Sequence, residues 1–265
     1  MEIPFHKYQG TGNDFVMIDN RDLSIPRDSV SLFAALCHRH LGVGADGVIL
    51  LQEKEGFDFE MVYANADGRE STMCGNGGRC IVRFAEACGI VRERYHFLAV
   101  DGMHEAMAYP DAVSLKMQHT AFPVRDGEAW VLNTGSPHWV RFTDGVGQLD
   151  MKKEGAAVRY SDTYNKEGIN VNFAEWLGDK LFMRTYERGV EDETLSCGTG
   201  VTAAALSLAA ELHWPAGAHR ISVDTPGGTL RVHFTLEDDG SYRDIWLTGP
   251  ARHVYSGTIR PAGLY

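Results

Sequence analysis

The chain has 265 residues, of which 44% are hydrophobic and 23% charged, so it can bury a large core, and the composition excludes a disordered protein. Its formal net charge of −11 argues against nucleic acid and anionic membranes as partners, because both would repel an acidic surface. No apolar run reaches the roughly 18 residues of a membrane helix and no signal peptide is recognisable, so we expect a cytoplasmic protein that binds a small molecule.

The first part of the chain predicts strands and helices in alternation. Apolar spacing and a glycine stop predict a helix over residues 29–42, and residues 57–65 are typical of a strand. Residues 77–89 are apolar and predict a central, buried helix. Residues 95–118 then predict consecutive hairpins separated by turn residues. The polar, Pro- and Gly-containing segment 119–127 is typical of a linker.

The second part of the chain repeats this order. A strand is predicted at 180–187, an Ala-rich buried helix at 199–212 and hairpins at 220–249. Five landmarks share one offset of 123 residues, as between Cys74 and Cys197 (197 − 74). The other pairs are Thr11-Gly12 with Thr134-Gly135, Tyr63 with Tyr186, Glu70 with Glu193, and Val100-Asp101 with Val223-Asp224.

A single gap-free offset across strand, loop and helix indicates a duplication. We predict an α+β protein of two similar halves that face each other. The N-terminal half spans residues 1–119, carries Cys74 and is completed by a C-terminal strand at 253–265. The C-terminal half spans residues 120–252 and carries Cys197.

The five cysteines are an odd number, which makes a disulfide framework improbable in a reducing compartment. Cys37, Cys80 and Cys88 lie within apolar helical stretches, and we interpret them as small buried side chains. Cys74 and Cys197 each precede a predicted helix, where free backbone N–H groups and the helix dipole favour negative charge. Both thiols are therefore predicted to be acidified.

Two symmetry-related thiols suit the inversion of a carbon stereocentre by proton transfer. That reaction needs a base on one face of the substrate and an acid on the other, and a thiolate opposite a thiol supplies both. The backbone N–H groups that follow each thiol can hold an α-carboxylate while the α-proton leaves. No cofactor is needed for this chemistry, and Cys74 and Cys80 lack a second ligand pair for zinc.

Six motifs occur in the chain in the order GTGNDF, GVGADG, NADGRESTMCGNGGRC, GSPH, YERG and ETLSCGTG. Together, over essentially the whole chain, they resemble diaminopimelate epimerase. The resemblance implies two pseudo-symmetric halves, each an antiparallel sheet or barrel around a central helix, with the active site in the cleft. It also implies a cofactor-independent enzyme that interconverts LL- and meso-diaminopimelate in lysine and peptidoglycan-precursor biosynthesis.

The resemblance also assigns site residues. Cys74 and Cys197 match the base and acid pair, and His138 matches a histidine that supports activity. The substrate contacts fall on Asn13, Asn65, Gly75, Asn76, Asn170, Glu187, Arg188, Gly198 and Thr199. Four of them suit the distal, unreacting end of the substrate: Arg188 for its carboxylate, Glu187 for its ammonium group, and Asn65 and Asn170 for neutral hydrogen bonds.

Two departures from the family pattern affect substrate preference. Ser136 stands where many members have asparagine, and the segment YERGVEDET is one residue longer than usual. A racemase of another amino acid is therefore a second hypothesis. A thiol redox protein or sensor is a third, although such proteins usually carry a short C-x-x-C motif. The sequence leaves open whether the chain forms a homodimer.

Overall fold

The computed structural model describes residues 2–260 and divides the chain into two compact units. Unit 1 comprises the residues up to Leu115 together with the chain from Gly249 onward, and unit 2 comprises Lys116–Thr248. The predicted boundaries at 119/120 and 252/253 each lie four residues further along the chain. None of the helices among the described residues is long and apolar enough to cross a membrane.

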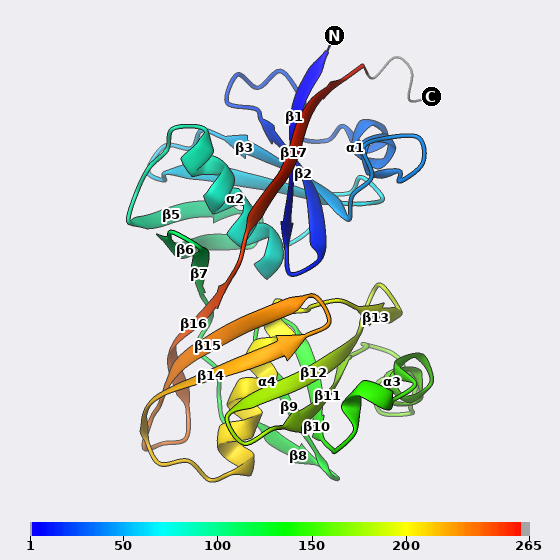
Figure 1. The fold of residues 1–265 in the computed structure, drawn as a ribbon, viewed down its shortest axis with the longest axis vertical. Helices are drawn as coiled ribbons and strands as arrows, with labels where there is room; N and C mark the ends of the chain where they lie inside the picture. Colours follow the sequence, from blue (N-terminus) through cyan, green and yellow to red (C-terminus); the bar gives the residue numbers. More distant parts are fainter. Residues whose placement is uncertain (1, 261–265) are drawn as a thin grey trace. The chain divides into compact units, whose positions relative to one another are not determined.

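Unit 1 is a mixed sheet that packs around one buried helix (Figure 1). Its strands pair in the order β17-β1-β2-β3-β4-β5-β6-β7, and only β2–β3 and β4–β5 are parallel. The strands are β1 (Ile3–Gly10), β2 (Asn13–Asp19), β3 (Gly47–Gln52), β4 (Phe59–Asn65), β5 (Arg94–Ala99), β6 (Gly102–Tyr109), β7 (Ala112–Lys116) and β17 (Arg252–Ile259). The buried helix α2 (Gly75–Ala87) packs against β1, β2, β3 and β6.

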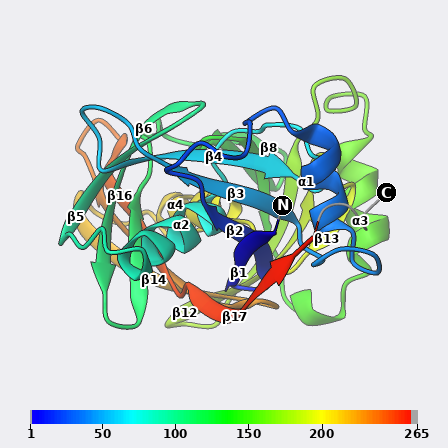
Figure 2. The same cartoon turned by 90° about the horizontal axis from the view of Figure 1, so that it is seen from above.

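The C-terminal strand of unit 1 lies alongside its N-terminal strand. Figures 1 and 2 show β17 next to β1, and the two pair antiparallel from Ile3 with Ile259 to Gln9 with Arg252. The prediction placed this strand at 253–265, whereas β17 ends at Ile259. Residues 261–265 of that prediction lie outside the described residues.

Unit 2 repeats the same pairing scheme. Its strands follow the order β8-β9-β10-β11-β12-β14-β15-β16, with β10–β11 and β12–β14 parallel, and β13 pairs with β12. The strands are β8 (Val124–Asp126), β9 (Ala129–Asn133), β10 (Pro137–Phe142), β11 (Asn170–Trp176), β12 (Lys180–Glu187), β13 (Asp192–Thr194), β14 (Gly217–Thr225), β15 (Gly228–Leu236) and β16 (Tyr242–Gly249). The 3₁₀ turn η1 (Val146–Gln148), helix α3 (Met151–Arg159) and the central helix α4 (Gly198–Glu211) complete the unit.

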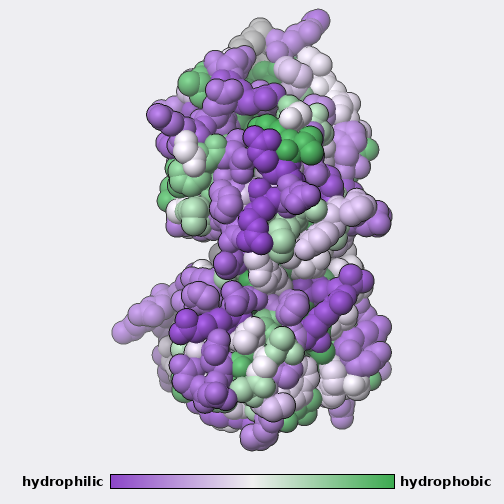
Figure 3. Space-filling view, turned by 90° about the vertical axis from the view of Figure 1, so that its left-hand side faces the viewer, coloured by the Kyte–Doolittle hydropathy of each residue, from purple (hydrophilic) through white to green (hydrophobic). Residues whose placement is uncertain are grey.

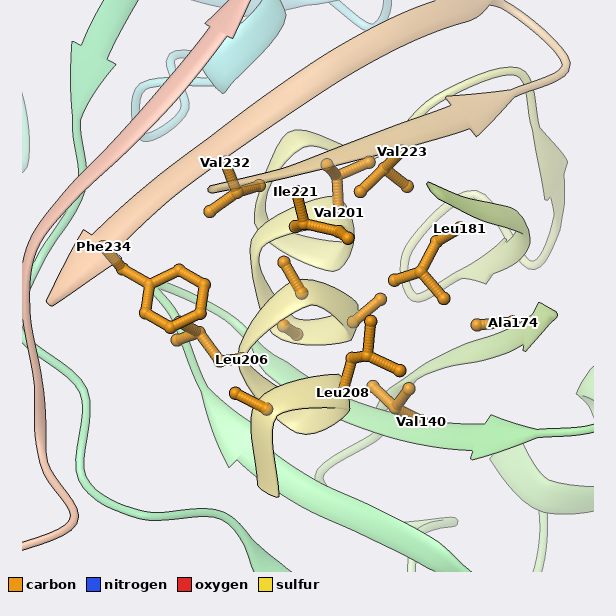
Figure 4. Close-up of a cluster of buried hydrophobic side chains, with 14 of the residues drawn as sticks. Val140, Ala174, Leu181, Val201, Leu206, Leu208, Ile221, Val223, Val232 and Phe234 are labelled. Atoms are coloured by element: carbon orange, nitrogen blue, oxygen red, sulfur yellow. The ribbon is translucent and has the colours of Figure 1, made fainter. Parts of the chain in front are cut away.

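The core of unit 2 forms around α4. Val201, Leu206 and Leu208 project from this helix toward apolar side chains of the surrounding strands, as Figure 4 shows. Burial of such aliphatic side chains stabilises a fold by roughly 1.5–3 kcal/mol each. On the face drawn in Figure 3, hydrophilic residues predominate and hydrophobic ones form only small patches.

The duplication is visible in the positions of the elements. Strands β3 and β11 begin at Gly47 and Asn170, and helices α2 and α4 begin at Gly75 and Gly198, in both cases 123 residues apart. The later hairpins differ, because their second strands begin at Gly102 and Gly228, which are 126 residues apart (228 − 102). Both glycines have positive φ, at 119° and 135°, which a side chain would disfavour.

Three details of the sequence-based prediction were wrong. The match of Val100-Asp101 with Val223-Asp224 is not structural, because the first pair forms a turn and the second lies within β14. Three additional residues before the second hairpin turn account for the difference. Helix α1 (Val30–Cys37) ends well before residue 42, since the chain turns back at His38 and Gly44 N–H donates to Leu36 O. The predicted linker contains strand β8.

Candidate active site

Each of the two conspicuous thiols is the N-cap residue of a central helix. Cys74 precedes α2 and Cys197 precedes α4, and both have extended backbones, with φ/ψ of −88°/132° and −114°/113°. Their carbonyl oxygens accept the first helical hydrogen bonds, from Gly78 N–H at 2.7 Å and Val201 N–H at 2.9 Å. An N-cap residue lies next to the first N–H groups of its helix, and this end of the helix dipole favours anions.

Cys74 lies in a network of amide side chains. Its Sγ donates to Asn13 Oδ1 at 3.4 Å, and Asn76 Nδ2 donates to the same oxygen at 3.2 Å. Asn13 Nδ2 donates in turn to Asp46 Oδ2 at 2.6 Å. Because an ionised carboxylate only accepts hydrogen bonds, Asp46 fixes the amide of Asn13 with its oxygen toward the sulfur.

A fully buried arginine supports this network from within α2. Arg79 Nη2 donates to Asn76 Oδ1 at 2.8 Å and to Thr11 Oγ1 at 3.1 Å, and Arg79 Nη1 donates to Gly75 O at 3.2 Å. Burial lowers the pKa of Arg79, and negative charge on the nearby cysteines Cys80 and Cys74, when they ionise, opposes that shift. Since a guanidinium only donates, Arg79 fixes the oxygen of Asn76 toward itself and the nitrogen toward Asn13.

Cys197 lies at the end of a second network, formed by other residue types. Its Sγ lies 3.4 Å from Thr199 Oγ1, and that hydroxyl lies 2.9 Å from His138 Nε2. Asn172 Nδ2 lies 3.1 Å from His138 Nδ1 on the other side of the ring. Burial, together with the positive charge of Arg188, lowers the pKa of His138 to about 3, so the ring is neutral near neutral pH.

A third group of polar residues lies at the ends of β11 and β12. Asn170 Nδ2 donates to Ser136 Oγ at 2.9 Å, and its Oδ1 accepts from Arg188 N–H at 2.9 Å. Arg188 Nη2 also donates to Ser136 Oγ at 3.4 Å. Glu187 Oε2 accepts from the hydroxyl of Thr194 at 2.7 Å. The structure therefore brings Asn170, Ser136 and Arg188 together, with Glu187 next in the chain.

The remaining cysteines are structural in character. Cys37 and Cys80 are buried as predicted, and burial raises the pKa of each to about 12. Cys88 is only half-buried, since it caps the C-terminus of α2, and burial raises its pKa to about 11. All three are protonated near neutral pH. Within residues 2–260, no group of three or more His, Cys, Asp or Glu is arranged to hold a metal ion.

Comparison with known proteins identifies the family. The family model for diaminopimelate epimerase matches residues 5–119 and 130–254. The chain belongs to the diaminopimelate epimerase family. A diaminopimelate epimerase of Flavobacterium psychrophilum is 47% identical over 257 residues, which cover 96% of this chain and 99% of that protein. One from Chlorobaculum tepidum is 44% identical, covering 94% and 98% of the two chains.

Solved structures of low sequence identity share the fold. A PhzF-family phenazine biosynthesis protein of Bacillus anthracis superposes with a TM-score of 0.71 at 13% identity, covering 98% of this chain and 99% of that chain. A hydroxyproline epimerase of Agrobacterium vitis, solved with trans-4-hydroxy-L-proline, gives 0.70 at 14% identity, covering 99% and 94%. These similarities confirm the predicted α+β fold of the diaminopimelate epimerase family.

Membership of the diaminopimelate epimerase family confirms that the protein is an isomerase, and it sets aside the redox-protein alternative. Of the site residues assigned by resemblance, Asn13 and Asn76 contact each other beside Cys74, and Thr199 and His138 contact each other beside Cys197. Asn170 contacts Arg188, which follows Glu187 at the end of β12. The others are Gly75 and Gly198, the first residues of α2 and α4, and Asn65, which is exposed at the end of β4.

Sequence reasoning missed three residues of these networks, namely Asp46, Arg79 and Asn172. The repeat contained a signal for two of them. Arg79 is a charged residue in an apolar helix, where the offset of 123 places Thr202 in the other unit. Asn172 is polar in a buried strand, where the same offset places Ile49. A buried repeat position that is charged or polar in one copy and less polar in the other is a candidate site position.

Proposed function

We propose that the protein interconverts LL-2,6-diaminopimelate and meso-2,6-diaminopimelate by proton transfer between the substrate α-carbon and the thiols of Cys74 and Cys197. The observation that supports this most is that both thiols are N-caps of the equivalent central helices in two repeated units. Relatives named diaminopimelate epimerase align over at least 94% of this chain, which supports the choice of substrate. The reaction belongs to lysine and peptidoglycan-precursor biosynthesis, in the cytoplasm.

In the proposed reaction one cysteine is a thiolate and the other a thiol. The thiolate takes the α-proton from one face of the substrate, and the thiol gives its proton to the opposite face of the carbanion. Each turnover thus exchanges the protonation states of the two sulfurs, and the reverse reaction restores them. Negative charge that develops on the α-carboxylate is stabilised by the N–H groups at the two helix starts, those of Gly75, Asn76, Gly198 and Thr199.

The distal end of the substrate carries a second carboxylate and ammonium group that never react. We propose that Arg188 binds this carboxylate, that Glu187 binds the ammonium group, and that Asn65 and Asn170 add neutral hydrogen bonds. Binding the distal end in one fixed orientation places only the other α-carbon at the thiols, so only that carbon reacts. Ser136 Oγ accepts hydrogen bonds from both Asn170 and Arg188. The residue that departs from the family pattern therefore lies within this proposed binding site for the distal end.

Proton exchange with solvent tests the proposal. The reduced protein is incubated with LL-diaminopimelate in D₂O, and deuterium at the α-carbon and the meso product are followed. We expect both to appear without added cofactor and to be lost in Cys74→Ala and in Cys197→Ala. Cys88→Ala, which removes a half-buried thiol at the other end of α2, is the matched control and should exchange normally.

Other results of the exchange experiment would contradict the mechanism or the choice of substrate. Normal turnover in either of the two cysteine variants would refute the two-thiol mechanism. Exchange of another amino acid, with none of diaminopimelate, would instead favour the racemase hypothesis and assign the change in preference to the surroundings of Ser136.

A further inference from the structure

We propose that Asn172 is a positioning residue that sets the direction of the hydrogen bonds reaching the sulfur of Cys197. The inference rests on the proposed role of Cys197 and adds the residue that prepares it. The hydrogen bonds run through four side chains, which we call the Cys197 relay: Asn172, His138, Thr199 and Cys197. Its three contacts are 3.1 Å, 2.9 Å and 3.4 Å long.

The orientation of the Asn172 amide is fixed by groups that only accept hydrogen bonds. Asn172 is fully buried on β11, and its Nδ2 donates to Trp139 O at 2.9 Å and lies 3.4 Å from Asn170 O. Main-chain carbonyls accept and never donate. On the opposite side of the amide, Oδ1 accepts from Thr185 Oγ1 at 3.0 Å. The nitrogen of Asn172 is therefore the atom that faces His138.

The amide in turn selects the tautomer of the histidine. Asn172 Nδ2 donates to His138 Nδ1, so that ring nitrogen must carry a lone pair. Because the buried ring is neutral, its one proton is on Nε2. Nε2–H then donates to Thr199 Oγ1, and the hydroxyl proton of Thr199 is left to point at Cys197 Sγ.

The relay ends with a hydrogen bond donated to sulfur. Such a bond stabilises the thiolate more than the thiol, so the relay favours ionisation of Cys197. It also means that His138 acts as a donor through Thr199, since its Nε2 already holds a proton. The equivalent positions in unit 1, Phe15 and Ile49, are apolar, and there the sulfur of Cys74 donates to Asn13. The relay is therefore a feature of unit 2.

Asn172→Asp tests the relay by replacing the donor with an oxygen of the same shape. The ionised carboxylate can only accept a hydrogen bond, so the single proton of the neutral His138 ring moves to Nδ1 and donates to it. Nε2 then no longer donates, and the Thr199 hydroxyl turns toward it. Two readouts are used on the substrate-free protein. ¹⁵N NMR reports the tautomer of His138, and mass spectrometry reports the alkylation rate of Cys197 by iodoacetamide, with Cys74 as the internal reference.

We expect the Nε2–H tautomer in the parent protein and its loss in Asn172→Asp. Alkylation of Cys197 near neutral pH should fall about tenfold, since a charge-assisted hydrogen bond changes ionisation by about that factor. The rate for Cys74 should be unchanged. At high pH Cys197 ionises in both the parent protein and Asn172→Asp, so their alkylation rates at Cys197 should become equal. A blocked or distorted site would keep the rate of the variant lower.

A second set of variants keeps the test decisive if Asn172→Asp does not fold. Thr199→Val removes the last donor and should slow alkylation of Cys197 by the same factor, and Thr199→Ser should restore it. Thr202→Val is the control for the same substitution, because Thr202 lies one turn further along α4 and is fully buried, but its hydroxyl donates to Gly198 O at 3.1 Å and not to the sulfur. Its Cys197 rate should equal that of the parent.

An Nδ1–H tautomer in the parent protein would overturn the proposal, as would unchanged alkylation in Thr199→Val. Neither readout needs a substrate. The NMR and alkylation results can therefore agree with the relay even if no proton exchange with diaminopimelate is observed. That outcome would refute the proposed function alone. The converse result would refute the relay and leave the two-thiol reaction standing.

Discussion

Gly200→Ala is expected to damage the Cys197 relay, whereas the equivalent change in the other unit is expected to be mild. Gly200 is the third residue of α4, and a Cβ there would lie 2.6 Å from Asn172 Oδ1 and 3.3 Å from His138 Cε1. Gly77, at the same place in α2, would put its Cβ 3.0 Å from Ile49 Cδ1. Both changes gain the same helix propensity of about 1 kcal/mol.

The geometry sets the size of the effect. Carbon and oxygen in ordinary contact are about 3.3 Å apart, so the Asn172 amide must retreat by about 0.7 Å. The three hydrogen bonds of that amide, at 2.9, 3.0 and 3.1 Å, cannot all survive such a shift. A buried group left unpaired costs about 1–3 kcal/mol, and overpacking costs a similar amount. After the gain in helix propensity, we expect Gly200→Ala to lower the free energy of unfolding by about 3 kcal/mol.

Gly77→Ala should remain within about 1 kcal/mol of the parent, because the end of the Ile49 side chain can rotate away. Urea unfolding of the parent and both variants measures the difference directly. Proton exchange on diaminopimelate should fall in Gly200→Ala and persist in Gly77→Ala, since only the first displaces the amide from His138. Equal denaturation midpoints for the two variants would refute the argument that Asn172 is rigidly held.

Three further changes test other parts of the structure. Ser136→Ala removes a hydroxyl that accepts from Arg188, and steady-state kinetics should show a raised KM for diaminopimelate with kcat nearly unchanged. Burial opposes ionisation of Asp14, but hydrogen bonds from two cationic side chains outweigh it and lower the pKa to about 2. The resulting stability, present above the unfolded pKa of about 3.9, is lost as the pH falls toward 2, so urea titrations of Asp14→Asn should be flatter in that window. Gly155→Ala would place a Cβ 2.4 Å from Tyr186 Cβ and should lower the urea midpoint despite its gain in helix propensity.

The features that could be predicted from the sequence are those that leave a local or periodic signal. The apolar helices, the strand patterns and the repeat together predict helix starts at Cys74 and Cys197, and both cysteines are N-caps in the fold. The end of α1 could not be placed in this way. Its apolar spacing continues past Cys37, but the turn after it is set by main-chain hydrogen bonds back to residues such as Leu36.

The residues that orient the site residues left almost no local signal. Asn172 meets His138 across 34 positions of the sequence, and Arg79 meets Thr11 across 68. Each contact depends on strands or helices brought together by the fold. The repeat can therefore mark the two positions as unusual, but it does not show which residues they contact. Family resemblance also points first to residues that touch the substrate, whereas these residues act through others.

The two units differ in their buried polar groups near the thiols. Unit 2 has His138 and Asn172 where unit 1 has Phe15 and Ile49, and unit 1 has Arg79 where unit 2 has Thr202. A buried polar group is destabilising unless its hydrogen bonds are complete, so neither network tolerates the loss of one member. Because main-chain pairing and the helix starts are the same in both units, they cannot distinguish the two thiols. What distinguishes the thiols is the side chain at each sulfur: Cys74 donates to Asn13, whereas in the proposed relay Thr199, the counterpart of Asn76, donates to Cys197.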